Sequence, residues 1–256
     1  MPVKHSHSGS RVLAVLEAIA THQPIGVRAL ARLLEIDLSA MQRTLKTLEV
    51  EGWIRPTREP PVRWEVTARI LLVANAAQGS NDLRRRARPL LEALRDDTGE
   101  TVLLVVLEGQ RFVIADVVES RQVLRLVPQI GTPVQARDTA TARAVLPYLD
   151  DAQQAVLLGA EPDADSRAAF EATRRRAYAV SDGEINPAAS NIAAPIFELD
   201  GAPVGAIVVL GPRERLTPAL HATVGAKVLA AARELSRAVP SSAGRSAAAR
   251  ASEPRR

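Results

Sequence analysis

The sequence predicts an α+β protein with a small helical N-terminal domain and a larger C-terminal domain built on a central antiparallel sheet. Two observations predict this division. Residues 10–66 show apolar side chains at helical spacing, broken by turn signals and followed by two short strand patterns. Beyond Thr98, β-rich apolar runs are separated by helical stretches, which is typical of an antiparallel sheet with helices packed against it.

Composition excludes several classes of protein. The 256 residues are 46% hydrophobic, and no apolar run reaches the roughly 20 residues that cross a bilayer. The N-terminus MPVKHSHSGS has no apolar signal core, so we expect a cytoplasmic protein without membrane contact. There is no cysteine, and the four histidines are scattered, so neither a metal site nor a cofactor is expected. A net charge of +4 permits DNA binding without demonstrating it.

Three short helices are predicted at the start of the chain. Apolar residues recur at helical spacing, and a proline and a glycine in HQPIG separate the first helix from the second. Ser, Asp and Asn favour the N-cap position because their side chains accept hydrogen bonds from the first free amides. In chain order we predict a disordered segment over 1–9, a helix over 10–21 with Ser10 as its N-cap, a helix over 27–35, and a third helix that Asp37 or Ser39 caps and that ends near Glu51.

Two short strands follow the third helix. Gly52 ends that helix, and the runs WIRP and VRWEV lie on either side of the loop TREPP. In the second run apolar and charged residues alternate, so Val62, Trp64 and Val66 are predicted to be buried. Three helices followed by a two-stranded ribbon over residues 10–66 are the layout of a winged helix-turn-helix.

The third helix is amphipathic, and its polar side is suited to DNA. At about one hundred degrees per residue, Met41, Thr44, Leu45 and Leu48 fall together and would pack on the first two helices. Arginine can form two hydrogen bonds to guanine and glutamine two to adenine, each good pair adding about 1–3 kcal/mol of discrimination. Wing arginines would reach the DNA backbone or the adjoining minor groove. The residues predicted to contact DNA are Ser39, Gln42, Arg43, Lys46 and Thr47 on the helix, and Arg58 and Arg63 on the wing.

The remainder of the chain divides into a linker helix over 67–80, a second domain over 81–238 and a basic, low-complexity tail over 239–256 that is predicted to be disordered. Arg84, Arg85, Arg86 and Arg88 follow the linker and are interpreted as a solvated helix face, with a phosphate contact as the alternative. The second domain is predicted to have strands within 101–108, 111–119, 123–129, 178–184, 191–200 and 202–211, and helices within 139–149, 150–158, 165–177 and 218–239.

Both domains resemble the IclR family of bacterial transcriptional regulators. The stretch VRALARLLEIDLSAMQRTLKTLEVEGWI is similar to the family's two-helix reader and wing, and DTATARAVL and DGEINPAASNIAAPIFELDGAPVGAIVVLGPRERL are similar to motifs of its C-terminal domain. Ala40, Thr44 and Ala142 stand where the family commonly has Thr, Leu and Gly. The resemblance implies a winged helix joined by a linker helix to a GAF-like effector-binding domain. It also implies a DNA-binding homodimer, often assembling to a homotetramer, that acts as a repressor or an activator, commonly of catabolic genes, and answers to a small molecule. We expect a repressor of nearby genes that binds a near-palindromic double-stranded DNA operator.

The resemblance further implies an effector pocket on one side of the C-terminal sheet. An apolar lining would suit an aromatic or short aliphatic acid. Asn191 has a second interpretation, a turn residue that caps a strand edge, and Asp182 and Glu184 within SDGE have a second interpretation as turn formers. The positions that match the family's effector site are Leu124, Leu126, Thr139, Thr141, Asp182, Glu184, Asn191, Val208 and Leu210.

Two other classes of function are alternatives to this one. A pair of carboxylates could serve an enzyme, but the chain has no nucleophile elbow, no phosphate-binding glycine loop and no metal-ligand cluster, so we do not expect catalysis. A small-molecule sensor or oligomerisation module would lack sequence-specific DNA reading, and an architectural DNA binder would accept any sequence and ignore small molecules. The carboxylates considered for catalysis are Asp116, Glu119, Asp138, Asp182 and Glu184.

Overall fold

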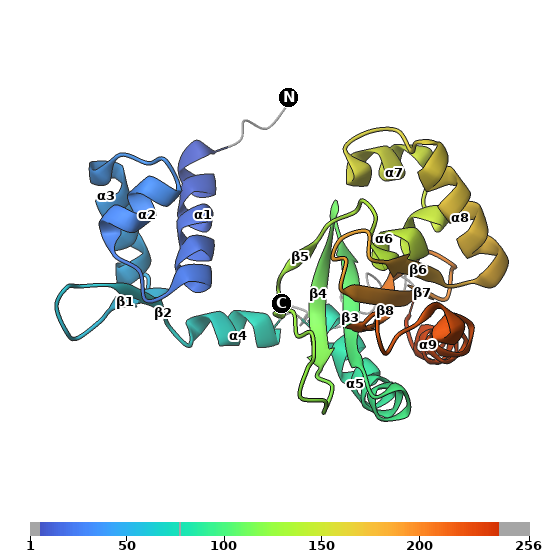
Figure 1. Cartoon of the computed structure of the whole chain (residues 1–256). Coiled ribbons are helices and arrows are strands. Elements are labelled where there is room, and N and C mark those ends of the chain that lie inside the picture. Colours follow the sequence, from blue (N-terminus) through green and yellow to red (C-terminus); the bar gives the residue numbers. More distant parts are fainter. Residues whose placement is uncertain (1–5, 77, 241–256) are drawn as a thin grey trace, which may run out of the picture. The chain divides into compact units, whose positions relative to one another are not determined.

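The computed structural model describes residues 6–76 and 78–240, and the chain divides into two compact units, Met1–Gln78 and Gly79–Arg256. Each unit is described by itself (Figure 1). The predicted disorder of residues 1–5 and of residues 241–256 lies outside the described residues. The tail was predicted to begin at 239, which is wrong for Val239, because this residue is buried in the core and its carbonyl accepts a hydrogen bond from the Leu199 amide. Within the described ranges, no helix combines the length and the apolar character needed to span a membrane.

The N-terminal unit consists of helices and a two-stranded wing, as predicted. Its first helix begins earlier than expected, because Ser6 and not Ser10 is the N-cap: the Ser6 hydroxyl accepts a hydrogen bond from the Gly9 amide at 3.3 Å. Residues 7–10 are exposed and carry no apolar side chain, so the first turn leaves no signal in the apolar spacing, and the predicted disorder is wrong for 7–9. The elements are α1 (His7–His22), α2 (Val27–Leu33), α3 (Leu38–Val50), β1 (Ile54–Pro56), β2 (Trp64–Val66) and α4 (Arg69–Ala76).

Helix α3 places its apolar side in the core of this unit. The predicted inward residues Met41, Thr44, Leu45 and Leu48 are all buried, with α1 and α2 packed against the same helix. The Thr44 hydroxyl donates to the Ala40 carbonyl at 3.0 Å, so its burial leaves no polar group unpaired. Full burial of a leucine or methionine side chain contributes about 1.5–3 kcal/mol. This packing therefore fixes which side of α3 remains exposed.

The wing is shorter than predicted. Strands β1 and β2 pair antiparallel over three residues each. The expectation that Val62 is buried is wrong, because this residue lies in the loop and is exposed. The ladder closes at the hydrogen bond from the Thr57 amide to the Arg63 carbonyl, 2.7 Å long. Pro60 and Pro61 in the loop have no N–H with which to extend it.

The C-terminal unit is built on a six-stranded antiparallel sheet with the order β5-β4-β3-β8-β7-β6. Helices α5 and α9 cover one face, and α6 and α8 cover the other (Figure 1). This sheet confirms the predicted α+β class. The strands are β3 (Thr101–Glu108), β4 (Arg111–Val118), β5 (Pro133–Val134), β6 (Ala179–Asp182), β7 (Ala189–Phe197) and β8 (Pro203–Pro212); the helices are α5 (Gln78–Thr98), α6 (Ala140–Val145), α7 (Asp151–Leu158), α8 (Ala164–Arg176) and α9 (His221–Ser236), with short 3-10 helices η1 (Leu146–Tyr148) and η2 (Pro218–Leu220).

The strand predicted over 123–129 is absent from the described sheet. The outer edge of β4 is occupied by the turn that leads into β5, since the Ile114 amide donates to the Thr132 carbonyl at 3.1 Å and the Gly131 amide donates to the Ile114 carbonyl at 2.8 Å. No free edge of β4 is left there for 123–129, which forms an exposed loop instead. The predicted linker over 67–80 holds α4 and the start of α5, and residue 77 lies outside the described residues.

Candidate nucleic-acid interface and effector site

Helix α3 begins at a well-defined N-cap. The Asp37 carboxylate accepts hydrogen bonds from the Ser39 hydroxyl at 2.6 Å and from the Ala40 amide at 2.8 Å. These hydrogen bonds, the one from Ser39 first, lower the pKa of Asp37, which keeps a negative charge at the positive end of the helix dipole. Of the two caps that the sequence allowed, Asp37 is the one used, and Ser39 supports it.

The polar side of α3 faces solvent. The Gln42 side chain makes no hydrogen bond with any described residue, and the Arg43 guanidinium makes only a 3.4 Å contact there, with the hydroxyl of Ser39 one turn before it. Lys46 pairs with Glu49 at 3.0 Å, and the Thr47 hydroxyl donates to the Arg43 carbonyl at 3.0 Å. Gln42 and Arg43 are therefore the side chains of this polar side that have the weakest contacts within the described chain. All five residues predicted on this helix are exposed, namely Ser39, Gln42, Arg43, Lys46 and Thr47.

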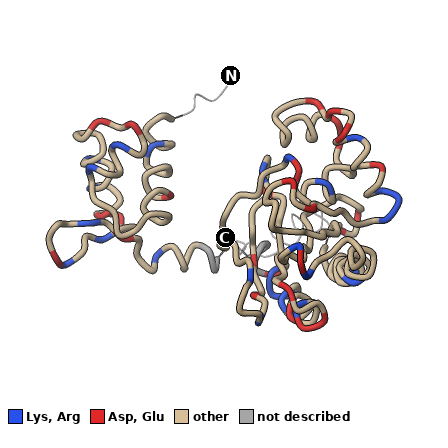
Figure 2. Tube along the Cα trace, viewed as in Figure 1, with Lys and Arg blue, Asp and Glu red and all other residues tan. Residues whose placement is uncertain are grey.

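Further arginines of the N-terminal unit are exposed. Arg58 in the wing loop and Arg63 before β2 form no ion pair within the described chain, whereas Arg55 pairs with a glutamate on the opposite strand at 3.4 Å. Arg28 and Arg32 on α2 are also exposed and form no ion pair with a described residue; the sequence prediction missed them, although their four-residue spacing in an apolar helix was a signal. Figure 2 shows basic positions on the helices and the wing of this unit.

On the α6 side of the C-terminal sheet, two predicted effector contacts have free hydrogen-bonding groups. Thr141 of α6 is 3% exposed and Asn191 of β7 is partly buried, yet neither side chain forms a hydrogen bond within the described residues. Asn191 is the register partner of Leu210, and Val208 lies two residues before Leu210 on the same face. Thr139 instead caps α6 by accepting an amide hydrogen bond at 3.2 Å.

Asp182 lies on the opposite face of the sheet from Asn191, so the prediction that both belong to a pocket on one side of the sheet is wrong. It pairs in register with Ser190, whose hydroxyl lies 3.2 Å from the His221 ring at the start of α9. Two 3.0 Å hydrogen bonds from Arg213 hold the carboxylate and are the first cause of the lowered pKa of Asp182. Asp182 is therefore part of an ion pair on the α9 side.

Glu184 lies on the α6 side, where it pairs with Arg143. The Arg143 guanidinium donates to Glu184 at 2.5 Å and to the Val180 carbonyl at 3.0 Å, and the Ser181 hydroxyl donates to Glu184 at 3.2 Å. Partial burial by itself raises the pKa of Glu184, but the hydrogen bonds from Arg143 and from backbone amides outweigh burial and lower it. Ser181 is the register partner of Asn191, so this polar group adjoins the free amide. The sequence prediction missed Arg143, which no local pattern distinguishes.

Leu124 and Leu126 do not form the predicted apolar wall. Both lie in the loop between β4 and β5, where Leu124 is 68% exposed and its carbonyl accepts a hydrogen bond from Arg215 at 3.0 Å. A hollow of about 30 Å³ beside α6 and α8 is lined by Asp138 and Arg143, among others, but by none of the predicted contacts. Its volume suits water rather than a metabolite.

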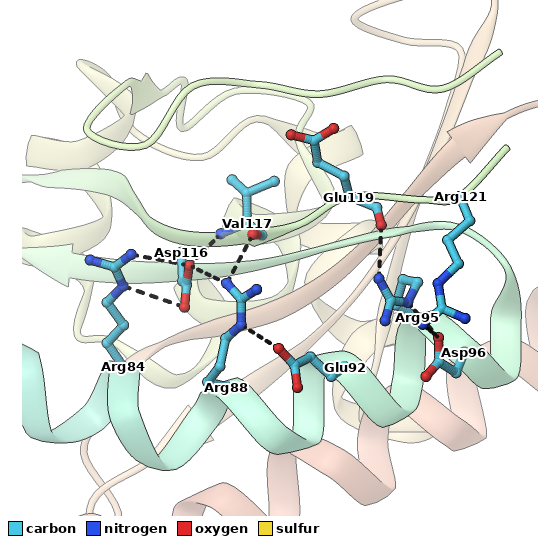
Figure 3. Close-up of polar contacts among 9 residues, drawn as sticks. All are labelled: Arg84, Arg88, Glu92, Arg95, Asp96, Asp116, Val117, Glu119 and Arg121. Carbon is cyan, nitrogen blue, oxygen red and sulfur yellow. Dashed lines mark hydrogen bonds and ion pairs between the residues drawn. The ribbon is translucent and has the colours of Figure 1, made fainter. Parts of the chain in front are cut away.

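The arginines near the start of α5 bind a buried carboxylate (Figure 3). Asp116 of β4, with a side chain 2% exposed, accepts a hydrogen bond from the Val117 amide at 2.9 Å and pairs with Arg88 at 3.2 Å and with Arg84 at 3.4 Å. The other two arginines of the cluster pair with an aspartate one turn before them on the same helix. All four arginines are exposed, as the interpretation as a solvated helix face expects, and Arg84 and Arg88 in addition join α5 to β4 through Asp116.

The carboxylates considered for catalysis are all engaged by arginines. In the described part of the chain, no three metal-ligating side chains gather into a group. The pairs are Asp116 with Arg84 and Arg88, Glu119 with Arg125, Asp138 and Glu184 with Arg143, and Asp182 with Arg213.

A three-helix unit with a wing, a capped helix with an exposed polar side and a separate α+β unit together define a helix-turn-helix regulator with a C-terminal effector domain. Residues 9–58 match the IclR helix-turn-helix domain, and residues 75–237 match the family described as bacterial transcriptional regulator IclR C-terminal. The chain belongs to the IclR family of DNA-binding transcriptional regulators, which are not enzymes.

Named relatives and solved structures agree with this assignment. The chain is 29% identical over 237 residues to the HTH-type transcriptional regulator BhcR of Paracoccus denitrificans, covering 88% of this chain and 85% of that protein. It is 28% identical over 240 residues to the acetate operon repressor of Salmonella typhimurium, covering 88% and 87%. An IclR transcriptional regulator from Alicyclobacillus acidocaldarius has the same fold, with a TM-score of 0.78 at 21% identity over 91% of this chain and 99% of that one.

Proposed function

We propose that the protein is a homodimeric repressor that lays α3 of each protomer in the major groove of a near-palindromic double-stranded DNA operator. The observation that carries this proposal is the exposed polar side of α3, on which Gln42 and Arg43 are free to bond bases. Two readers related by a two-fold axis would meet half-sites about 34–36 Å apart, or a multiple of that distance. Arg58 and Arg63 would contact phosphates or the minor groove. Because the operator is chromosomal DNA, the proposed place of action is the cytoplasm.

Exposed apolar residues on α4 support the homodimer. Leu71, Leu72 and Val73 follow one another on this helix, and all three are exposed in the single chain. Consecutive exposed apolar residues on a short helix are typical of a surface that a partner covers. Because a two-fold interface uses the same patch on both protomers, a second copy of α4 is the proposed partner. Further assembly to a homotetramer is proposed on the family resemblance.

We also propose that a small-molecule effector binds on the α6 side of the sheet. Support comes from Thr141, a residue 3% exposed whose hydroxyl has no hydrogen-bond partner among the described residues, and from the unpaired Asn191 amide. An aromatic or short aliphatic acid would compete with Glu184 for the Arg143 guanidinium, since a carboxylate is the group that arginine already binds there. Such a ligand changes the affinity for the operator only if it binds more tightly to one relative placement of the two α3 helices of the dimer than to another.

The regulated genes are proposed to be nearby catabolic genes. The relative from Salmonella typhimurium is named for an acetate operon, which fits a short aliphatic acid as the effector class. Footprinting and gel shifts with the gene's own upstream region are the direct test. A sensor module that does not read DNA would protect no site, and an architectural binder would bind scrambled DNA equally well.

Two variants separate base reading from phosphate attraction. Arg43→Ala should weaken binding to the protected site by roughly 5-fold to 150-fold, the equivalent of about 1–3 kcal/mol, and change scrambled-DNA binding little. Arg58→Ala should weaken binding to the protected site and to scrambled DNA by the same factor. It should also reduce the slope of log affinity against log salt concentration by about 1, the effect of one lost phosphate contact. Equal losses of Arg43→Ala on both duplexes would contradict base reading by α3.

The effector site is tested by thermal unfolding with benzoate and acetate as probes. We expect one of these acids to raise the melting temperature of the wild type and to have no effect on Arg143→Gln. Glu184→Gln removes the competing carboxylate and should bind the acid more tightly. If Asn191→Leu binds the acid with unchanged affinity, Asn191 is not part of the site. If Arg143→Gln binds the acid with unchanged affinity, the proposal that the acid binds Arg143 is refuted.

A further inference from the structure

The first residue of the linker helix α4 contacts the C-terminal end of α3. Helix α3 ends at Val50, and the last carbonyls of a helix have no partner within it. The Arg69 guanidinium donates a hydrogen bond to one of these free groups, the Glu51 carbonyl. The same guanidinium lies 5.2 Å from the centre of the Trp53 ring, where it makes a cation–π contact. One side chain of α4 therefore binds both the end of the proposed reading helix and the residue that leads into the wing.

Thr67 strengthens the same junction. Its hydroxyl donates to the Gly52 carbonyl at 2.6 Å, and its amide donates to the Trp53 carbonyl at 2.9 Å. The hydroxyl also accepts a 3.3 Å hydrogen bond from the Arg69 amide. Gly52 has a φ of 73°, a left-handed conformation that lets the chain turn sharply after α3. The end of α3 and the start of α4 are thus joined by side-chain and backbone hydrogen bonds.

The contacts of Arg69 are unusual for an exposed arginine. No carboxylate lies within ion-pair distance of it anywhere in the described chain, so its donors are directed at a carbonyl and its plane at a ring. A positive charge is favourable at the C-terminal end of a helix dipole. The planar guanidinium also constrains orientation, which the flexible ammonium of lysine does less well. Together these contacts define the angle between α3 and α4.

We propose that Arg69 is a positioning residue for DNA recognition. With Thr67, it holds α3 at a fixed angle to the linker helix and so determines which half-site spacing the dimer accepts. This inference rests on the proposed binding of two half-sites by a homodimer. Arg69 acts through α3 and requires no contact with DNA.

The test uses the full-length protein and duplex DNA that carries the site protected by the wild type. Two further duplexes have one base pair added or removed between the half-sites, which moves one half-site by about 3.4 Å and turns it by about 35°. We expect the wild type to lose about tenfold in affinity on the altered duplexes, the size of one lost base contact. Arg69→Ala should lose less than about threefold. Arg69→Lys keeps a positive charge but loses the planar guanidinium, so it should recover only a small part of the wild-type penalty.

Matched variants distinguish positioning from loss of charge or of folding. Arg55→Ala also removes an exposed arginine from this unit, but Arg55 pairs with Glu65 and has no hydrogen bond to α3 in the described structure. It should weaken binding to all three duplexes alike and keep the spacing penalty. Thr67→Val removes the hydrogen bond to Gly52 and should relax the spacing as Arg69→Ala does, which provides a second test if one variant fails to fold.

Two results would overturn the proposal. In the first, folded Arg69→Ala and Thr67→Val lose as much affinity on the altered duplexes as the wild type does. In the second, Arg55→Ala tolerates the altered spacing as well as Arg69→Ala does. The proposed function fails in a different way. In that case the wild type protects no site, and this is seen before any variant is compared.

Discussion

Replacing Asp116 with alanine is expected to destabilise the C-terminal unit by about 3 kcal/mol. The carboxylate is 2% exposed and accepts the Val117 amide, and a buried amide that loses its acceptor costs about 1–3 kcal/mol. The ion pairs add roughly 0.2–1 kcal/mol each, because the Arg84 and Arg88 side chains are 46% and 45% exposed and remain hydrated when their partner is lost. Asp116→Asn keeps an acceptor for the amide and should cost only about 1 kcal/mol.

The two units can be observed separately during urea unfolding. Both tryptophans, Trp53 and Trp64, lie in the N-terminal unit, so their fluorescence reports on that unit, whereas far-ultraviolet circular dichroism reports on both. Asp116→Ala should lower the midpoint of the C-terminal transition by about 1–2 M urea and leave the fluorescence midpoint unchanged. Arg85→Ala, a 75% exposed member of the same cluster, is the control and should stay within about 0.5 kcal/mol of the wild type. An Asp116→Ala protein as stable as the wild type, or one in which both transitions shift together, would refute the assignment.

Three further variants test the packing and the ion pairs. Leu45→Ala should cost about 2–5 kcal/mol, lower the fluorescence midpoint and weaken DNA binding; an unchanged midpoint would contradict its burial in the core. In Gly211→Ala the new Cβ would lie 2.7 Å from the buried Glu100 carboxylate. The urea midpoint of the C-terminal unit should therefore fall, by an amount equivalent to about 1–3 kcal/mol of stability. A higher midpoint would show that there is room for a methyl group beside Glu100. Arg213 lowers the pKa of Asp182 in the folded protein below its ordinary value of 3.8. The ion pair therefore stabilises the folded state fully above pH 3.8, and this stabilisation is lost as the pH falls through the pKa of Asp182 in the folded protein. The stability difference between the wild type and Asp182→Asn should therefore be constant from roughly pH 7 to 5 and shrink below about pH 4, and a difference that grows in acid would exclude this ion pair.

Local periodicity predicted most of the fold. The strand predicted over 101–108 is β3 to the residue, and four of the five buried residues of α3 were predicted, Ala40 being missed. Both predictions follow from how side chains repeat along a regular backbone. The first turn of α1 could not be predicted in this way, since its residues are polar, and hydrogen bonds to Ser6 from the amides of Gly9 and Ser10 identify it as helix. The loop over 123–129 has a strand-like pattern, but a strand also needs a free edge, and β5 occupies that edge of β4.

Charged residues show the same limit over longer distances. Asp116 is 32 residues from Arg84 in the sequence, and Glu100 is 115 residues from Arg215. The cluster beginning at Arg84 could be seen in the sequence, but its charge alone does not say whether water, a phosphate or a carboxylate on another element will face it. Only the packing of α5 on the sheet provides that partner.

The same reasoning explains why the sequence predicted the exposure of the proposed DNA contacts better than the directions of the proposed effector contacts. The proposed DNA contacts lie on one helix and the adjoining wing, so a single amphipathic pattern determines their direction. The proposed effector contacts come from several strands, loops and a helix between Leu124 and Leu210, and a shift of one residue along a strand moves a side chain to the other face. Asp182 shows the consequence: it is the last residue of β6 and faces α9, whereas the turn at Gly183, with a φ of 94°, returns Glu184 to Arg143 on the α6 side. Two carboxylates of one short motif thus belong to different ion pairs, and a ligand that displaces Glu184 would leave Asp182 bound to Arg213.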